Sequence, residues 1–292
     1  MHLEPAGEEQ YPGLAGRIES IGAIVAALDA DLVVATGDLT NRGSYRAADF
    51  AAAKRWLDDL GAPYLALPGN HDLGANPHRG ELFPESERYE DVPFSSTGYA
   101  GTFGPDAVVS MRVGDLTVIG VALRENDPDR ALEGLETHLV HAPGPVVVAG
   151  HYPVILPRPW PGTDAFGALG YIDGAATRLA DIIRGDDRII SYLCGHVHLT
   201  SRHPIGSHCM QFTAGALGPG AAALRVYDWD GAVWAYSTID VAGPQIFWEN
   251  FSESAREDPS FSSGSPEERA GRWAPLSHHR SPSRPSPPPS DQ

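Results

Sequence analysis

The chain of 292 residues is 42% hydrophobic and 20% charged, so it is long enough to bury a sizeable core. It contains no apolar run of the roughly 18–20 residues that a membrane span needs and opens on no signal segment, so we expect a cytoplasmic protein with no membrane partner. Its formal net charge of −17 argues against a nucleic-acid partner, because contact with phosphates requires an excess of Lys and Arg.

Helices and strands alternate in the first part of the chain. Apolar residues at helical spacing predict helices over residues 14–28 and 44–60, and short apolar runs predict buried strands over residues 31–36 and 63–67. This order predicts a parallel pair of strands with helices packed on the sheet. Ligand sites in such sheets lie beyond the carboxyl ends of the strands, so the residues that follow each strand are candidates for a site.

The second part of the chain is predicted to complete one domain over residues 1–250. The expected elements, in order, are a long loop over residues 73–102, a hairpin over 108–121, a helix over 132–140, a strand over 145–149, a loop over 157–170, a helix over 175–183 and strands over 189–194, 209–213, 222–227 and 233–239. The last three strands are expected to extend a second, more antiparallel sheet. Residues 251–292 are rich in Ser and Pro, and this composition predicts a disordered tail.

Four of the predicted strands end in a glycine that is followed by side chains able to bind a metal ion. The residues at these ends are Asp38, Asn70, His71, His151, His196 and His198. Each alone has an ordinary explanation as a turn or a helix cap, but four such ends on one chain favour a shared site. One carboxylate, one amide oxygen and several imidazoles form a mixed ligand set that suits Mn, Fe or Zn. The two cysteines, Cys194 and Cys209, indicate no disulfide framework.

The chain resembles the calcineurin-like metallophosphoesterases in the order and spacing of four motifs: Gly37-Asp38, Gly69-Asn70-His71-Asp72, Gly150-His151 and Gly195-His196-Val197-His198. The resemblance covers roughly residues 1–240. It implies an α/β fold in which a two-sheet mixed β sandwich is flanked by helices in the order αββα. It also implies two metal ions, each Mn, Fe or Zn, at the strand ends.

The resemblance implies a role for each candidate metal ligand. Asp38 would bridge the two metal ions. Asn70, His151 and His196 would complete the coordination of one ion, and His198 would bind the other.

The same resemblance implies the chemistry. His71 would lie near the leaving oxygen as an acid or transition-state donor, and Asp72 would orient its ring. The expected activity is the hydrolysis of a small phosphodiester, with a 3',5'-cyclic nucleotide as one candidate, by attack of a metal-bridging hydroxide. Two alternatives stay open: a phosphomonoesterase, and a non-catalytic scaffold with an incomplete first metal site. A homodimer also stays open.

The first motif of the family departs from its pattern here. The family begins with a strand that ends Asp-x-His, and His2 matches this histidine, while the Asp would lie one residue before Met1. We therefore expect an N-terminally truncated sequence that lacks the first strand, with His2 as a ligand of the ion bound by His198. The alternative is that Met1 is the true start and His2 is an ordinary terminal residue.

Overall fold

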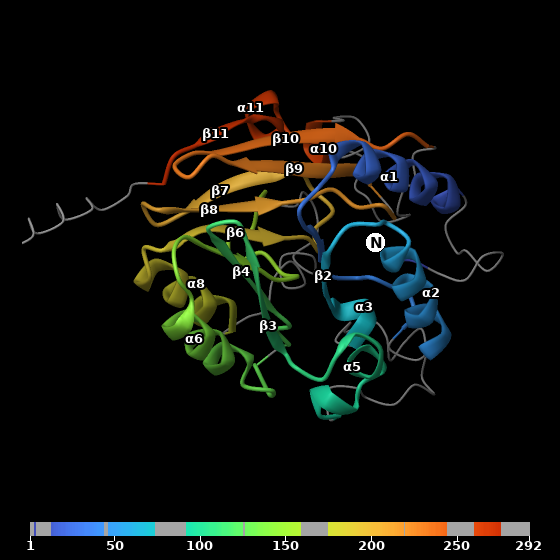
Figure 1. Ribbon diagram of the computed structural model, residues 1–292, viewed down its shortest axis with the longest axis horizontal. Helices are drawn as coiled ribbons and strands as arrows, with labels where there is room; N and C mark the ends of the chain where they lie inside the picture. The colour runs from blue at the N-terminus through green and yellow to red at the C-terminus, as the bar shows by residue number, and fades with distance from the viewer. Residues whose placement is uncertain are drawn as a thin grey trace, which may run out of the picture.

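Two β layers lie at the centre of the molecule and helices cover their outer faces (Figure 1). The computed structural model describes residues 3, 13–43, 46–73, 92–124, 126–158, 175–218, 220–243 and 260–275. His2 lies outside the described residues, as do most of the loops expected over residues 73–102 and 157–170.

A six-stranded mixed sheet forms the larger β layer, with the strand order β3-β4-β5-β6-β8-β7. The strands span Val108–Val113 (β3), Leu116–Val121 (β4), Val146–Ala149 (β5), Ile189–Cys194 (β6), Cys209–Thr213 (β8) and Ser201–Ile205 (β7). β4, β5, β6 and β8 run parallel, while β3 and β7 pair antiparallel at the two edges. Every residue of β4, β5 and β6 is buried, as parallel strands covered on both faces require.

The second β layer consists of two smaller sheets. β1 (Val33–Thr36) and β2 (Tyr64–Leu67) pair in parallel, and Leu3 bridges to Thr40 just beyond the end of β1. β9 (Ala223–Trp229), β10 (Trp234–Asp240) and β11 (Gly271–Trp273) form an antiparallel sheet. Residues of β1, of β9 and of the six-stranded sheet line a cavity of about 660 Å³.

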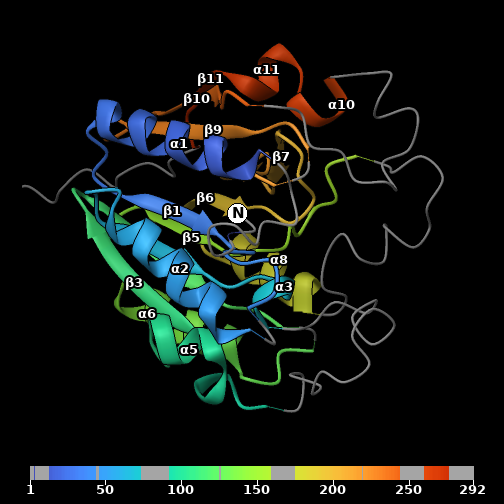
Figure 2. The ribbon, with the colours of Figure 1, turned by 90° about the vertical axis from the view of Figure 1, so that its right-hand side faces the viewer.

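Helices pack on both outer faces. They span Leu14–Leu28 (α1), Ala47–Asp58 (α2), Asn70–Leu73 (α3), Gly98–Phe103 (α5), Ala131–His141 (α6), Ala175–Gly185 (α8), Ser260–Ser263 (α10) and Pro266–Arg269 (α11), with a 3₁₀ turn at Phe94–Ser96 (η2). α6 and α8 lie together on one side of the six-stranded sheet, whereas α1 and α2 lie on the side of β1 (Figures 1 and 2). No helix among the described ranges is long and apolar enough to cross a membrane.

Three hydrophobic cores hold these layers together. Leu132 and Ile183 of α6 and α8 pack with Val148 of β5 in the first core. Val147, on the opposite face of β5, packs with Trp234 of β10 in the second core, between the two β layers. The third core lies beneath α1 and α2 and contains Ile21 and Phe50, among others. The order helix, sheet, sheet, helix confirms the predicted αββα sandwich.

Most predicted elements occur where the periodicity placed them. α1 has the predicted bounds, 14–28, and the predicted hairpin is formed by β3 and β4 around Gly114. The predicted parallel pair is β1 and β2.

The expected long loop over residues 73–102 is wrong in its last part, which contains η2 and α5. Thr97 caps α5 by accepting a hydrogen bond from the backbone N–H of Ala100. Tyr99 and Phe103 stack on one another, and both meet Phe50 of α2 edge-on. Packing against α2 therefore stabilises a helix that begins with glycine and is too short to show a periodicity.

The assignment of residues 209–213 to the second sheet is also wrong. β8 joins the six-stranded sheet and pairs with β6. Residues 201–205 form an additional strand, β7, which lies at the edge of this sheet and pairs with β8. The polar sequence of β7 and its Pro204 do not indicate a strand, but an edge position tolerates a residue that lacks an N–H group.

The predicted disorder over residues 251–292 is wrong for residues 260–273. α10 and α11 form there, and β11 adds to the antiparallel sheet by pairing with β10. Ser265 and Glu268 form a reciprocal capping box at the start of α11. The rest of the predicted tail lies outside the described residues.

Arg17 provides a test of the packing of α1. Its buried guanidinium Nη1 donates to the carbonyl oxygens of Leu217 (2.8 Å) and Gly218 (2.6 Å), which follow β8. We expect Arg17→Ala to lower the free energy of unfolding by about 2–4 kcal/mol, because it empties a buried position and removes a charged donor from two carbonyls. Urea denaturation measures this change. Glu19→Ala, at an exposed position of the same helix, should change stability by less than about 0.5 kcal/mol; equal effects of the two substitutions would contradict this account of α1.

Candidate metal centre

The candidate site lies where four parallel strands end. Asp38 follows β1, Asn70 and His71 begin α3 after β2, His151 follows β5, and His196 and His198 follow β6. The structure therefore brings the four glycine-led motifs to one edge of the two β layers, as the strand order predicts.

His151 is the centre of this group. Its Nδ1 lies 2.8 Å from the carbonyl oxygen of Thr36, and because a carbonyl can only accept, Nδ1 carries the proton. Its Nε2 lies 3.1 Å from Asn70 Oδ1 and 3.4 Å from Asp38 Oδ2. Nδ1 of His196 lies 3.1 Å from the same Nε2.

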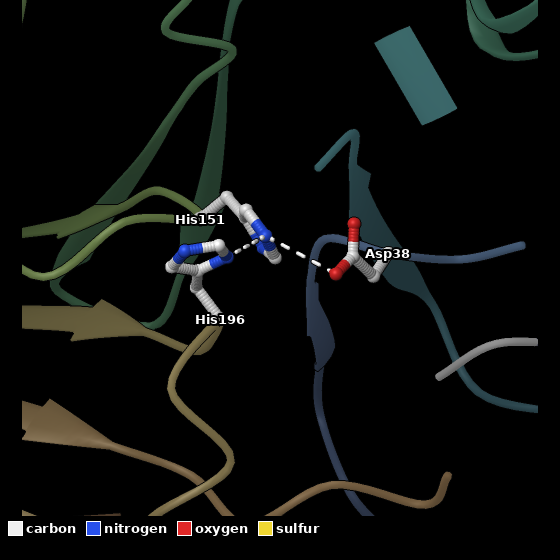
Figure 3. A group of neighbouring side chains, drawn as sticks. All are labelled: Asp38, His151 and His196. Atoms are coloured by element: carbon white, nitrogen blue, oxygen red, sulfur yellow. Dashed lines mark hydrogen bonds and ion pairs between the residues drawn. The ribbon is translucent and has the colours of Figure 1, made fainter. Parts of the chain in front are cut away.

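The chemistry of these atoms fits a metal ion. With its proton on Nδ1, His151 directs a lone pair from Nε2 toward three other groups that can each offer a lone pair. A metal ion, or a proton shared between these atoms, stabilises such an arrangement. The ligand atoms of Asp38, His151 and His196 all lie within 4.8 Å of one another, and Figure 3 shows the three side chains converging. The Thr36 carbonyl fixes the ring of His151, as outer-shell partners of metal ligands commonly do.

The electrostatics of the two buried histidines differ. Burial disfavours the protonated ring of His151, but the Asp38 carboxylate together with the Thr36 carbonyl outweighs burial and raises the pKa of His151, so a proton competes with a metal ion for Nε2 in the metal-free protein. Burial lowers the pKa of His198 to about 3, so its imidazole is neutral, as a metal ligand must be. His198 lies on the same loop as His196 and outside the three-residue group that surrounds His151 Nε2.

Three of the candidate ligands adopt a backbone conformation that is uncommon outside glycine. The φ angles of Asp38, His196 and His198 are 47°, 64° and 54°. Left-handed residues of this kind carry a small conformational cost and persist where the surrounding structure fixes them, often at functional sites. Each lies in the turn that follows a strand.

The glycines of two motifs leave space for the ligands. A Cβ atom on Gly37, whose φ is 96°, would lie 2.2 Å from Nδ1 of His151. A Cβ atom on Gly69 would lie 2.2 Å from Oδ1 and 2.5 Å from the backbone nitrogen of Asp38. Both glycines are therefore required by close packing at the site.

Asp72 joins two of the loops that carry candidate ligands. Its buried carboxylate accepts hydrogen bonds from the backbone N–H groups of Leu39, Thr40 and Gly69 and from the Thr40 hydroxyl, at 2.7–2.9 Å. Burial and the nearby Asp38 carboxylate raise the pKa of Asp72. Both carboxylate oxygens of Asp72 thus hold the loop after β1 to the loop after β2, and the expectation that Asp72 orients the ring of His71 stays a prediction.

The ring of His71 contacts the backbone carbonyl of Asn41. Nδ1 of its ring lies 3.0 Å from the Asn41 carbonyl oxygen, which places the proton on Nδ1. Its backbone N–H donates to Asp38 Oδ1 (2.9 Å), so His71 and the predicted bridging carboxylate are directly connected.

Sequence analysis missed three residues that shape the site. Thr36 and Asn41 act through their backbone carbonyls, which no side-chain pattern reveals. Tyr152 forms an aromatic wall, with its ring centroid 4.8 Å from that of His151 and 4.7 Å from that of His196. Its position directly after His151 was the available signal.

Comparisons with known proteins agree with this geometry. A family model described as calcineurin-like phosphoesterase matches residues 1–199. The chain is 24% identical over 176 residues to a protein of a Synechococcus strain named a probable cyclic nucleotide phosphodiesterase, a match that covers 58% of each chain. It is 27% identical over 173 residues to a probable glycerophosphodiester phosphodiesterase of Arcobacter nitrofigilis, covering 59% of this chain and 58% of that protein. The chain thus spans somewhat over half the length of these relatives.

A solved structure shares the fold. A dimetal phosphatase from Danio rerio superposes with a TM-score of 0.52 at 12% identity, covering 78% of this chain and 89% of that chain. At this identity the likeness concerns the fold alone.

Gly69→Ala tests the close packing at the site. We expect this variant to lose most of its bound Mn²⁺, because the added Cβ displaces Asp38, while its circular dichroism spectrum stays that of the unaltered protein. Elemental analysis after loading with Mn²⁺ and gel filtration measures the metal content.

Gly22→Ala is the matched control. Gly22 lies within α1 with no atom in the way of a Cβ, so the variant should keep its metal and gain about 0.5–1 kcal/mol of stability. Full metal content in Gly69→Ala would contradict the assignment of Asp38 as a ligand.

Proposed function

The chain belongs to the calcineurin-like phosphoesterase family, and we propose that it is a metal-dependent phosphodiesterase acting on a small phosphodiester. The observation that carries this proposal is the convergence of Asp38, Asn70 and His196 on Nε2 of His151. A third histidine, His71, is connected to Asp38 and is fixed by its own backbone and ring contacts. The proposed setting is the cytoplasm, with no membrane or nucleic-acid partner.

Two metal ions complete the proposed site. Asp38 would contact both, Asn70, His151 and His196 would hold one, and His198 would hold the other, with Mn, Fe or Zn as suitable ions. Two such ions supply a nucleophilic water at neutral pH and offset the charge that develops on the phosphoryl oxygens. The chain itself fixes the ligands: the Thr36 carbonyl orients His151, and Asp72 holds the β1 and β2 loops at a constant separation.

His71 is the proposed proton donor to the leaving oxygen. The Asn41 carbonyl retains the proton on Nδ1, so Nε2 is the ring atom at which a second proton is held and given up. The hydrogen bond from the His71 backbone to Asp38 keeps this donor at a fixed distance from the metal ligands. A fixed donor of this kind assists departure of the alcohol without reorganisation of the site.

A phosphodiester is the proposed substrate class, with a 3',5'-cyclic nucleotide as the first candidate. The two relatives named above are both designated phosphodiesterases, although each is matched over only 58% of its length. A phosphomonoester is the competing substrate class for this chain.

Hydrolysis assays test the substrate class directly. With Mn²⁺ bound, we expect the protein to hydrolyse bis(p-nitrophenyl) phosphate and 3',5'-cyclic AMP at least tenfold faster than p-nitrophenyl phosphate, measured as kcat/KM. A preference for the monoester would overturn the phosphodiesterase proposal and favour the phosphatase alternative.

His71→Ala separates an enzyme from a scaffold. We expect kcat to fall about 10²–10⁴-fold, the range typical of a lost proton-transfer group, with Mn²⁺ content unchanged. The matched control is His141→Ala at the exposed end of α6, which should keep full activity. If His71→Ala retains the activity of the control, His71 is not the proton donor, and absence of turnover by the metal-loaded parent would favour the scaffold.

A further inference from the structure

Residues 260–275, here called the C-terminal segment, contact the loop that carries His198. Thr200 lies two residues beyond His198, and its backbone N–H donates to the carbonyl oxygen of Ser262 at 2.9 Å. Gly264 packs so closely on Thr200 that a Cβ at this glycine would lie 2.6 Å from the Thr200 carbonyl oxygen. The segment therefore lies directly on residues 195–200, here called the His198 loop.

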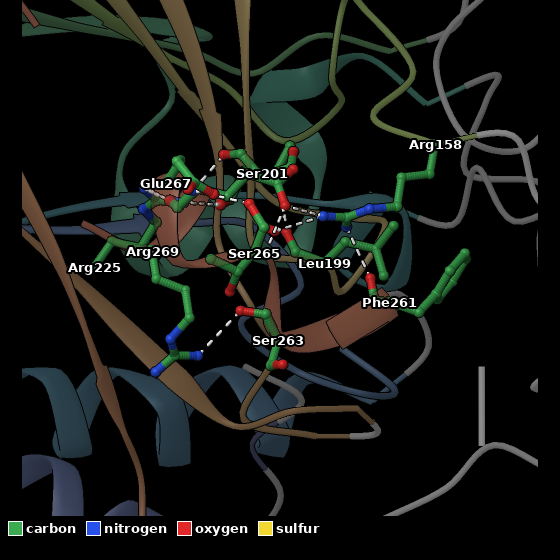
Figure 4. A network of polar contacts seen from close by, with 12 residues as sticks. Arg158, Leu199, Ser201, Arg225, Phe261, Ser263, Ser265, Glu267 and Arg269 are labelled. Carbon is green, nitrogen blue, oxygen red and sulfur yellow. Dashed lines mark hydrogen bonds and ion pairs between the residues drawn. The ribbon is translucent and has the colours of Figure 1, made fainter. Parts of the chain in front are cut away.

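Arg158 joins the same contact from the loop that follows His151. Its Nη1 donates to the carbonyl oxygen of Phe261 (2.8 Å), and its Nη2 donates to the carbonyl oxygen of Thr200 (3.4 Å) and forms an ion pair with Glu268. Figure 4 shows Arg158 reaching to Phe261 on one side and to the backbone at Leu199–Ser201 on the other. One guanidinium thus connects the C-terminal segment with the loops that follow β5 and β6.

Glu268 is itself held in place for this ion pair. One of its carboxylate oxygens, Oε2, accepts the backbone N–H of Ser265 at 2.8 Å within the capping box. Its carbonyl oxygen accepts from Arg225 of β9, which also donates to the carbonyl oxygen of Ser201. The side chains of Arg158 and Glu268 are each 18% exposed, so solvent screens their attraction less than it screens a surface pair.

We propose that the C-terminal segment and Arg158 are positioning elements of the metal centre, which set the place of His198 relative to His151 and His196. The inference rests on the proposed role of His198 as a metal ligand. His198 has a left-handed φ of 54°, and a residue in this conformation keeps its place only where neighbouring contacts fix the chain. The contacts of Thr200 and Ser201 supply such restraint immediately after it.

Residues 151–158, here called the His151 loop, are also held by neighbouring contacts. Oε1 of Gln211 in β8 accepts hydrogen bonds from the N–H groups of Val154 and Ile155. The His151 loop meets the His198 loop where the N–H of Gly195 donates to the carbonyl oxygen of His151. Arg158 adds a contact at the far end of both loops. Two loops that are joined at both ends cannot change their separation freely, which favours one fixed arrangement of ligands.

Arg158→Ala tests this inference in the full chain. We expect one of two Mn²⁺ sites, measured by isothermal titration calorimetry, to weaken about 10–100-fold, the range typical of lost outer-shell partners. Hydrogen–deuterium exchange of the metal-free protein should become faster over residues 197–201 and stay unchanged in β5 and β6. Arg158→Lys should give an Mn²⁺ affinity and an exchange rate between those of the unaltered protein and of Arg158→Ala. An ammonium keeps the ion pair but cannot reach two carbonyls in the geometry of a guanidinium.

Two further variants make the test specific. Glu268→Gln removes the ion pair with little change of shape and should weaken the same Mn²⁺ site. The matched control is Glu136→Gln, which breaks a pair of partly exposed side chains with Arg178 far from the loops and should change neither readout.

The possible failures are distinguishable. Wild-type Mn²⁺ affinity at both sites in Arg158→Ala and Glu268→Gln would overturn the positioning role, even if exchange becomes faster. No Mn²⁺ binding by the unaltered protein would overturn the metal-centre assignment itself, and with it this inference.

Discussion

Buried groups that turn lone pairs toward one another need a shared cation or proton between them, and this constraint governs the edge of the molecule that carries the site. The ligand atoms of Asp38, His151 and His196 lie within 4.8 Å of one another, and the amide oxygen of Asn70 lies 3.1 Å from Nε2 of His151, which is itself almost fully buried. Burying such groups is unfavourable unless each finds a partner. A cation would supply a common partner for all of them, so an ion bound at the candidate site would also relieve the electrostatic cost of burying these groups.

Hydrogen bonds to backbone N–H and carbonyl groups hold the candidate ligands and the loops that carry them in place. Asp72 forms four hydrogen bonds between the loops after β1 and β2, and the carbonyls of Thr36 and Asn41 each fix one histidine ring. The two β layers hold these loops at one edge, with buried strands on both sides. These contacts and the buried strands limit the motion of the candidate ligands.

The sequence predicted the layers and the ligand loops but not the contacts that connect them. Glycine-led motifs after apolar runs and the order of helices and strands were sufficient for β1, β2, β5 and β6, since short buried strands are recognisable from composition. The hydrogen bonds that Asp72 accepts from Leu39 and Thr40 were missed because these residues lie more than thirty positions away in the chain. α5, β7 and the C-terminal segment were missed because long-range packing, not local pattern, stabilises them.

The contact between the C-terminal segment and the His198 loop has a consequence for the order in which the protein matures. Ribosomes release a chain from its N-terminus, so all four ligand motifs emerge before residues 260–275. β6 and β8 can pair while the His198 loop still lacks Ser262, Gly264 and Glu268 as neighbours. The nascent chain therefore carries every described candidate ligand some time before the backbone that restrains the last of them. The proposed positioning role of the C-terminal segment implies that full metal affinity is acquired only after synthesis has passed these residues.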